Sequence, residues 1–174
     1  ISIIDNIFIN KSASRGGGLF NSSGRMYVTG NTFNGNTGES ASGISLEFAV
    51  AFILNNTFSN NVGYNVIYCE ADSQIISNNT ISNNIGSGIV CSKDCKTTIS
   101  DNAITNNTGP ALVISSNFYS GAIVYIYRNF LSQNSYIKGA GIYFSNGGNH
   151  TVSNNIICNN KADSLGGAIF CNNS

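Results

Sequence analysis

The chain has 174 residues, of which 41% are apolar and only 9% are charged, and its basic and acidic residues balance to a net charge of zero. This balance excludes the basic patch that nucleic acid binding requires and the polybasic segment that an anionic membrane attracts. No apolar run approaches the roughly 18 residues of a membrane-spanning helix, so we expect no membrane insertion. The 29 asparagines are the dominant feature of the composition, and their positions are periodic.

One asparagine recurs along the whole chain at intervals of 23 to 27 residues. A β-branched residue lies three positions before each copy, and an apolar residue lies two positions after it. Repeats of roughly 20–50 residues mark a solenoid, in which each repeat buries its apolar face only by stacking on its neighbours. The recurring positions are Asn6, Asn31, Asn56, Asn79, Asn102, Asn129 and Asn155.

Each repeat contains, in chain order, three short extended segments separated by polar corners. The repeat that begins at Ser73 has Ile76 before the asparagine, Ile81 after it, and Ile89 in a third segment that follows Gly88. β-branched and aromatic residues between Asn and Gly corners favour strands over helices. The third segment recurs as a glycine followed by apolar residues at 17–20, 43–46, 88–91, 141–144 and 167–170.

Three strands per repeat and no helical stretch predict an all-β fold, a right-handed parallel β-helix solenoid of about seven coils. We expect residues 1–174 to form a single β-helical segment that is uncapped at both ends. Asparagines at one place in every coil can hydrogen-bond to the coils on both sides, and the buried amides then form a ladder. A second ladder lies five residues later, with Lys11 in the first coil followed by Asn36, Asn61, Asn84, Asn107, Asn134 and Asn160.

Two tetrapeptide signatures recur in these coils. GGxx occurs at 166–169, and FxxN occurs at 33–36 and 58–61. In these signatures the chain resembles the β-helical passenger regions of polymorphic outer membrane proteins, and more broadly the right-handed β-helix repeat proteins. The resemblance covers essentially all of the coils and implies an exported, surface-exposed β-helix that is adhesive or forms filaments.

The five cysteines are compatible with an oxidising compartment. Neither a CxxC motif nor a Cys/His quartet is present, so the spacing does not favour a metal site, and we expect no cofactor. We expect instead a local disulfide between Cys91 and Cys95, or a pairing of Cys69 with one of these. The odd number leaves at least one thiol free or paired outside this segment.

Cleavage of a polysaccharide would need converging carboxylates. Aligning the third and fourth coils places Glu70 over Lys93, with Asp72 and Asp94 nearby, and carboxylates converge nowhere else in the pattern. We interpret this cluster as a solvated turn with a surface ion pair rather than a weak cation site, and His150 as a surface residue. We therefore expect no enzymatic activity, and a polysaccharide-binding or polysaccharide-degrading β-helix is the alternative.

A second alternative is ice or mineral binding by a flat face of Thr and Ser side chains. Three coils carry a threonine directly after the recurring asparagine, but other coils place apolar residues in the same column. This three-coil patch is too short and too irregular to favour such a function. The threonines are Thr32, Thr57 and Thr80.

The turn from Ser115 to Gly121 is about four residues longer than its counterparts in the other coils. It carries two aromatic residues, Phe118 and Tyr119, which are candidates for a lateral contact or a ligand site. A tolerated insertion without a function is the alternative.

N-x-S/T sequons are no more frequent than the abundance of Asn, Ser and Thr predicts. Their placement is informative, because they fall at turns or beside the ladder positions and never on the first ladder. Covalent glycans are therefore sterically possible at each one. The seven acceptors are Asn10, Asn21, Asn55, Asn78, Asn106, Asn149 and Asn172.

The period also continues across the two ends of the chain. If Ser174 is joined to Ile1, the interval from Asn155 to Asn6 is 25 residues, which equals the interval between the first coils. Open strand edges at the ends of a stack are templates for further pairing. We therefore expect an extracellular or cell-surface structural rod, a segment or subunit of a head-to-tail filament or adhesin stalk.

Overall fold

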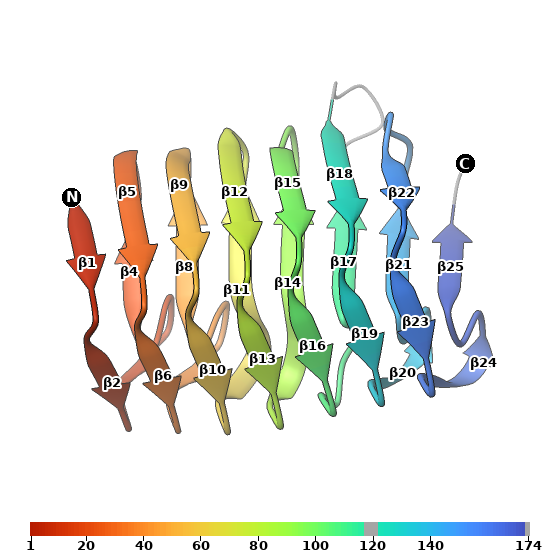
Figure 1. Cartoon of the computed structure of the whole chain (residues 1–174), viewed down its shortest axis with the longest axis horizontal. Coiled ribbons are helices and arrows are strands. Elements are labelled where there is room, and N and C mark those ends of the chain that lie inside the picture. Colours follow the sequence, from red (N-terminus) through yellow and green to blue (C-terminus); the bar gives the residue numbers. More distant parts are fainter. Residues whose placement is uncertain (117–121, 173–174) are drawn as a thin grey trace.

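The chain folds into a rod of stacked coils. The computed structural model describes residues 1–116 and 122–172, and its strand pairings are parallel and join each coil to the next. The two ends of the chain lie at opposite ends of the rod (Figure 1). The described part contains strands and turns but no helix, and hence none long and apolar enough to cross a membrane. The predicted parallel β-helix is confirmed.

Two sheets of seven strands each form two sides of the rod. Residues one coil apart pair in register in both sheets, as Phe33 pairs with Phe58. The first sheet contains β1 (Ser2–Ile4), β5 (Gly24–Thr29), β9 (Ala49–Leu54), β12 (Ser73–Ser77), β15 (Lys96–Ser100), β18 (Ile123–Tyr127) and β22 (Thr151–Ser153). The second sheet contains β2 (Ile7–Ile9), β6 (Thr32–Asn34), β10 (Thr57–Ser59), β13 (Thr80–Ser82), β16 (Ala103–Thr105), β19 (Phe130–Ser132) and β23 (Ile156–Cys158).

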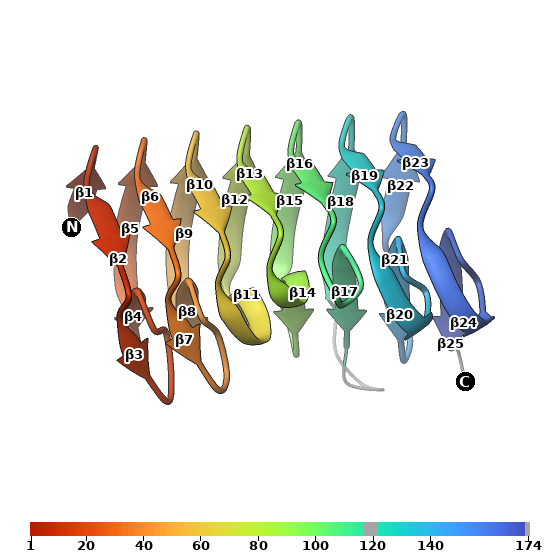
Figure 2. The same ribbon diagram turned by 90° about the horizontal axis from the view of Figure 1, so that it is seen from below.

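The third sheet closes each coil and is less regular. It contains β3 (Ser12–Ala13), β4 (Leu19–Asn21), β7 (Thr37–Gly38), β8 (Ile44–Glu47), β11 (Val62–Glu70), β14 (Ile85–Ser92), β17 (Leu112–Ser115), β21 (Ile142–Ser145) and β25 (Ile169–Asn172). In every coil the chain makes a detour, which we call a side arm, from the second ladder to the inward column of this sheet, and the arms of the first two coils contain β3 and β7. In the last two coils the side arms form a separate pair of strands, β20 (Ser135–Lys138) and β24 (Lys161–Leu165). The arms with β3 and β7 lie near one end of the rod, and those with β20 and β24 lie near the other (Figure 2).

Both predicted ladders are confirmed as columns of hydrogen bonds. The side-chain Nδ2 of Asn56 donates to Asn79 Oδ1 at 3.0 Å and to the main-chain oxygens of Val28 and Leu54 at 2.9 and 3.0 Å. Its Oδ1 accepts from the backbone N–H and the Nδ2 of Asn31 at 2.8 and 3.0 Å. The pattern recurs in the same direction along the rod. Because each amide is satisfied in this way, it can be buried without a large desolvation cost.

The residue before each first-ladder asparagine turns the chain at a corner. Its φ angle is positive, for example 57° at Asn55 and 58° at Asn78. Asn adopts this left-handed conformation more readily than most residues with a side chain, and glycine adopts it freely, as Gly30 does at 70°. The same conformation precedes the second ladder at Asn60 and Asn83. The frequent Asn-Asn pairs therefore join a corner residue to a ladder residue.

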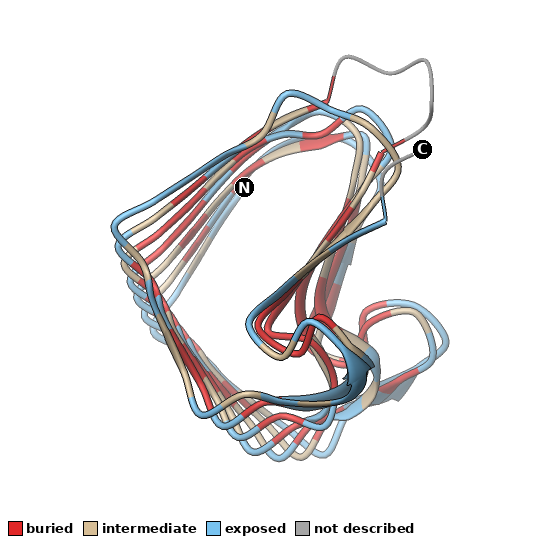
Figure 3. Cartoon of the chain, turned by 90° about the vertical axis from the view of Figure 1, so that its right-hand side faces the viewer, coloured by how far each residue is buried: buried red, intermediate tan, exposed pale blue. Residues whose placement is uncertain are grey.

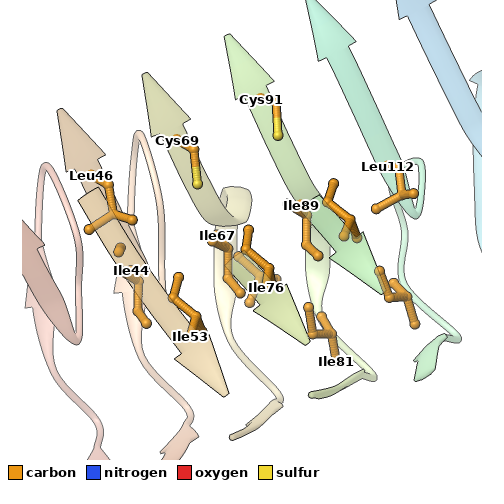
Figure 4. Packing of buried hydrophobic residues seen from close by; sticks show 14 of the residues in the cluster. Ile44, Leu46, Ile53, Ile67, Cys69, Ile76, Ile81, Ile89, Cys91 and Leu112 are labelled. Carbon is orange, nitrogen blue, oxygen red and sulfur yellow. The ribbon is translucent and has the colours of Figure 1, made fainter. Parts of the chain in front are cut away.

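Apolar side chains fill the interior of each coil. Phe8, Phe33 and Phe58 stack with ring centroids 4.6 and 4.7 Å apart, and Ile81 and Ile104 continue their column. Figure 4 shows how inward-facing side chains of neighbouring coils line up along the rod. The inward residues of the middle coils are buried, whereas the end coils are largely exposed (Figure 3). Fully burying one such side chain contributes about 1.5–3 kcal/mol, so the middle coils hold most of the stabilising burial.

Replacing one amide in the middle of the first ladder should destabilise the rod strongly. In Asn56→Ala, the oxygens of Val28 and Leu54 lose a donor and the N–H groups of Asn31 lose an acceptor. Each buried group left unsatisfied costs about 1–3 kcal/mol, so we expect a loss of about 3 kcal/mol in the free energy of unfolding. Urea denaturation followed by circular dichroism measures it.

The neighbouring corner residue provides a matched control. Asn55 is exposed, and glycine adopts its φ of 57° without strain. Asn55→Gly should therefore change the free energy of unfolding by less than about 0.5 kcal/mol. A similar loss in both variants would show that the ladder amide is not the stabilising element.

Candidate functional site

The side arms differ in length from coil to coil. We measure each arm from its second-ladder position to the first inward residue of the third sheet, a column that runs from Leu19 to Ile169. The seven coils span 8, 8, 6, 5, 5, 8 and 9 residues. The shortest arms therefore lie between longer ones. A groove of about 610 Å³ opens here, and residues of β20 form part of its wall.

Aromatic, aliphatic and uncharged polar side chains line this groove, and the aliphatic ones include the exposed Ile85 and Ile137. Tyr64 from the third coil is 77% exposed, and Tyr136 from the sixth coil is 44% exposed. Tyr143 contributes from β21, and hydroxyl groups come from Ser87 and Thr108. The groove was not predicted from the sequence, although the sequence shows the change in arm length.

One cation reaches the groove. Lys138 is the only residue of the described lining with a formal charge at neutral pH, and its Nζ lies 5.5 Å from the ring centroid of Phe170. The described lining contains no Asp or Glu. The described lining therefore offers aromatic and aliphatic faces, hydroxyl groups and one positive charge, but no carboxylate for acid–base chemistry.

The predicted contact between Glu70 and Lys93 is confirmed as an ion pair near the surface. The Tyr68 hydroxyl also donates to Glu70 Oε2 at 2.9 Å. The hydrogen bond from Lys93 lowers the pKa of the Glu70 carboxyl. Neither Asp72 nor Asp94 takes part in the pair, and no group of three or more His, Cys, Asp or Glu among the described residues is placed to hold a metal ion.

His150, which we interpreted as a surface residue, is partly exposed but also packs against its neighbours. Its ring stacks on Phe144 with centroids 5.5 Å apart. Its Nδ1 accepts a hydrogen bond from the backbone N–H of Val124 at 3.3 Å, and its Nε2 lies 3.4 Å from Ser116 Oγ. Burial lowers the pKa of the imidazole. The ring therefore favours its neutral form and connects β18 to the turn before β22.

Three cysteines lie together in the core, and the predicted disulfide among them is wrong because all five cysteines are free. Cys69 and Cys91 pair one coil apart, and their thiols point into the core (Figure 4). The Cys95 thiol lies 3.4 Å from the main-chain oxygen of Cys69. The turn after Cys91 directs the Cys95 thiol to the main-chain oxygen of Ser92, to which it donates at 3.0 Å. The three thiols pack as small core residues.

The environment of these thiols opposes ionisation. The hydrogen bond with Cys69, together with burial, raises the pKa of the Cys91 thiol. The hydrogen bond with Cys91, together with burial, raises the pKa of the Cys95 thiol. A bound metal ion would itself deprotonate a coordinating thiol, so geometry decides whether the site fits, and no group of three or more His, Cys, Asp or Glu among the described residues is arranged to hold a metal ion.

The other predicted surface features have different outcomes. The threonine column is confirmed over three coils, because Thr32, Thr57 and Thr80 pair in register. It ends at an alanine in the fifth coil and an isoleucine in the first, which limits the flat polar face to those three coils. The proposed contact residues Phe118 and Tyr119 lie outside the described residues.

The predicted glycan acceptors lie at or near the surface. Asn21 is partly exposed, and the other six are exposed. Four of them occupy left-handed corner positions, so their side chains lie where the chain turns at the outside of the rod. Glycosylation stays a prediction. The four corner acceptors are Asn10, Asn55, Asn78 and Asn106.

Thiol accessibility should divide the five cysteines into two classes. In the native protein at pH 8, Ellman's reagent should label the exposed Cys171 and the partly exposed Cys158. The buried Cys69, Cys91 and Cys95 should react only after unfolding, because reagents attack accessible thiolates. Rapid native labelling of all five, or a Cys91–Cys95 disulfide in peptide mass spectra, would contradict this assignment.

Comparison with known proteins gives one family. Residues 1–138 match the family described as periplasmic copper-binding protein NosD. No curated protein and no solved structure is significantly similar to the chain. The resemblance to polymorphic outer membrane proteins therefore holds only for the shared β-helix repeat, in which FxxN joins an inward phenylalanine to the second ladder. The chain belongs to the NosD family of β-helix repeat proteins.

Proposed function

We propose that this domain is a non-enzymatic structural rod that continues head to tail, with further coils of a longer chain or with a second copy. The observation that carries the proposal is that, among the described residues, the first ladder leaves one unused acceptor at one end and one unused backbone donor at the other. The description of the NosD family as periplasmic supports a location outside the cytoplasm.

The N-terminal end of the rod, which we call the first end, offers a hydrogen-bond acceptor. Asn6 Nδ2 donates to the main-chain oxygen of Ile4 at 2.8 Å and to Asn31 Oδ1 at 3.2 Å. Its own Oδ1 accepts no hydrogen bond from a described residue. At the other end, Asn155 Oδ1 accepts from Asn129, but its backbone N–H has no acceptor in the described part. An added coil would complete both hydrogen-bonding patterns.

Apolar side chains are exposed at the same two ends. Stacking of further coils would remove part of this surface from water, at about 25 cal/mol for each Å² buried. It would also pair the open strand edges. The exposed residues are Ile1, Ile4, Ile7 and Ile9 in the first coil, and Val152, Ile156, Leu165 and Ile169 in the last.

The direction of the ladder determines how copies can stack. Each amide donates toward the later coil and accepts from the earlier one. Two first ends would bring acceptors together, whereas a first end and a last end are complementary. Such a heterologous contact repeats without closing, which favours a filament over a closed dimer.

The side-chain arrangement supports a non-enzymatic role. A polysaccharide-degrading enzyme would need two carboxylates on either side of the scissile bond, and the described groove lining has none. Three of the eight acidic residues are held in ion pairs near the surface. These pairs are Arg15–Glu47, Lys93–Glu70 and Arg128–Asp101.

Copper binding, which the family description names, is not part of this proposal. The clustered thiols of Cys69, Cys91 and Cys95 are buried in the core. No described group of three or more potential ligands is arranged for a metal ion. The residues do not fit a copper centre, so the proposal assigns the chain no copper chemistry.

Lys11 provides the test of head-to-tail stacking. It occupies the second-ladder position in the first coil and has no amide oxygen to accept from Asn160 of another copy. Lys11→Asn should add up to two hydrogen bonds at the junction, each worth about 0.5–1.5 kcal/mol. We expect the association constant to rise about tenfold, measured by sedimentation velocity with electron microscopy at rising concentration.

Two further variants complete this experiment. Asn6→Ala removes the first-ladder acceptor and should weaken association by a similar factor. Lys96→Asn removes an exposed lysine from the middle of the rod and should leave association unchanged. Wild-type protein and Lys11→Asn that both remain monomeric at all concentrations would refute association between copies.

A further inference from the structure

We propose that the groove beside β20 binds an acidic oligosaccharide, a chain of sugar rings that carry carboxylates. This inference goes beyond the structural rod and does not depend on head-to-tail stacking. It follows from four properties of the groove: exposed aromatic faces, unoccupied hydroxyl groups, an unopposed cation, and a neighbouring strand that is unsuited to pairing.

The aromatic side chains provide stacking surfaces for sugar rings. One face of a pyranose presents mainly C–H groups, which pack on an aromatic ring while the hydroxyl groups remain free to hydrogen-bond. Tyr64 and Tyr136 are 77% and 44% exposed. They belong to the third and sixth coils, and three coil spacings amount to about 14 Å. This separation suits a chain of several rings rather than a single sugar.

The two coils between those of Tyr64 and Tyr136 contribute hydroxyl groups to the groove. The hydroxyl groups of Ser87 and Thr108 come from the fourth and fifth coils and line the same groove. Neither hydroxyl makes a hydrogen bond to another described residue. Both can therefore donate to, or accept from, a sugar hydroxyl without breaking an existing contact.

The charge of the groove favours an anionic ligand. Lys138 brings a positive charge to the groove, and no Asp or Glu of the described lining opposes it. Its Nζ lies 5.5 Å from the centre of the Phe170 ring, which favours one position of an otherwise flexible side chain. A carboxylate on the ligand would gain a charge-assisted hydrogen bond there.

An extended peptide is the competing occupant, and β20 is poorly suited to it. β20 is an edge strand, because it pairs only with β24. It has four residues, and its register shifts between Tyr136 and Lys138. Short strands, irregular register and an edge lysine are the features by which proteins prevent strand addition. The groove therefore favours recognition by side chains over main-chain pairing.

Matched ligands test the role of charge. We would titrate the protein with tetragalacturonate and with its methyl ester, which keeps the sugar rings but removes the carboxylates, using isothermal titration calorimetry. The acid should bind about tenfold more tightly than the ester, as expected for about 1.4 kcal/mol. Lys138→Met should reduce binding of the acid by the same factor and leave binding of the ester unchanged.

Tyrosine variants locate the ligand. Tyr64→Ala and Tyr136→Ala should each weaken binding of both acid and ester several-fold, because stacking is independent of charge. Tyr125→Ala is the control, since Tyr125 is 48% exposed on β18 in the first sheet. Circular dichroism of each variant separates loss of binding from loss of folding.

Three results would overturn the proposal. The first is no binding of tetragalacturonate or tetramannuronate at millimolar concentration. The second is binding that survives both the Lys138 and Tyr64 substitutions, which would place the ligand elsewhere. The third is equally tight, Lys138-dependent binding of hexaglutamate, which would make the groove a site for acidic peptides. Each titration is performed on monomeric protein, so failure here leaves the proposal of a structural rod unaffected.

Discussion

The hydrogen bond from each ladder asparagine to its counterpart in the next coil is the constraint on which the rod depends. The same amide also binds the main-chain oxygens around the corner, as Asn56 does with Val28 and Leu54. One side chain therefore fixes both the corner of its own coil and the register with its neighbours. Because the bond is made only when two coils align, a shift of one residue would leave a buried amide unsatisfied.

The corners leave one part of each coil free to vary. The first and second ladders are always five residues apart, whereas the side arm that follows varies from 5 to 9 residues. Short arms at the fourth and fifth coils open the groove without disturbing the ladders. The regular part of the repeat thus supports the stack, and the irregular part forms its recessed surface.

The columns of the rod could be predicted from the sequence because the period alone places one residue above another. The contact of Glu70 with Lys93 follows from counting 23 residues. Side-chain directions within turns do not follow from counting. Cys95 points to a main-chain acceptor rather than to a disulfide partner, and His150 accepts a hydrogen bond from Val124 in a neighbouring coil. The groove was missed for a related reason, since its lining comes from four different coils.

The two ladders differ in their first members, and this difference bears on the proposed stacking. The first ladder begins with Asn6, whose amide oxygen can accept a further coil. The second begins with Lys11, whose backbone N–H donates to Asn36 Oδ1 at 2.9 Å but whose side chain has no acceptor. A lysine at an open edge also opposes stacking, because its ammonium must be desolvated. The first coil therefore combines one corner whose amide oxygen is free to accept a hydrogen bond with one corner that lacks such an oxygen.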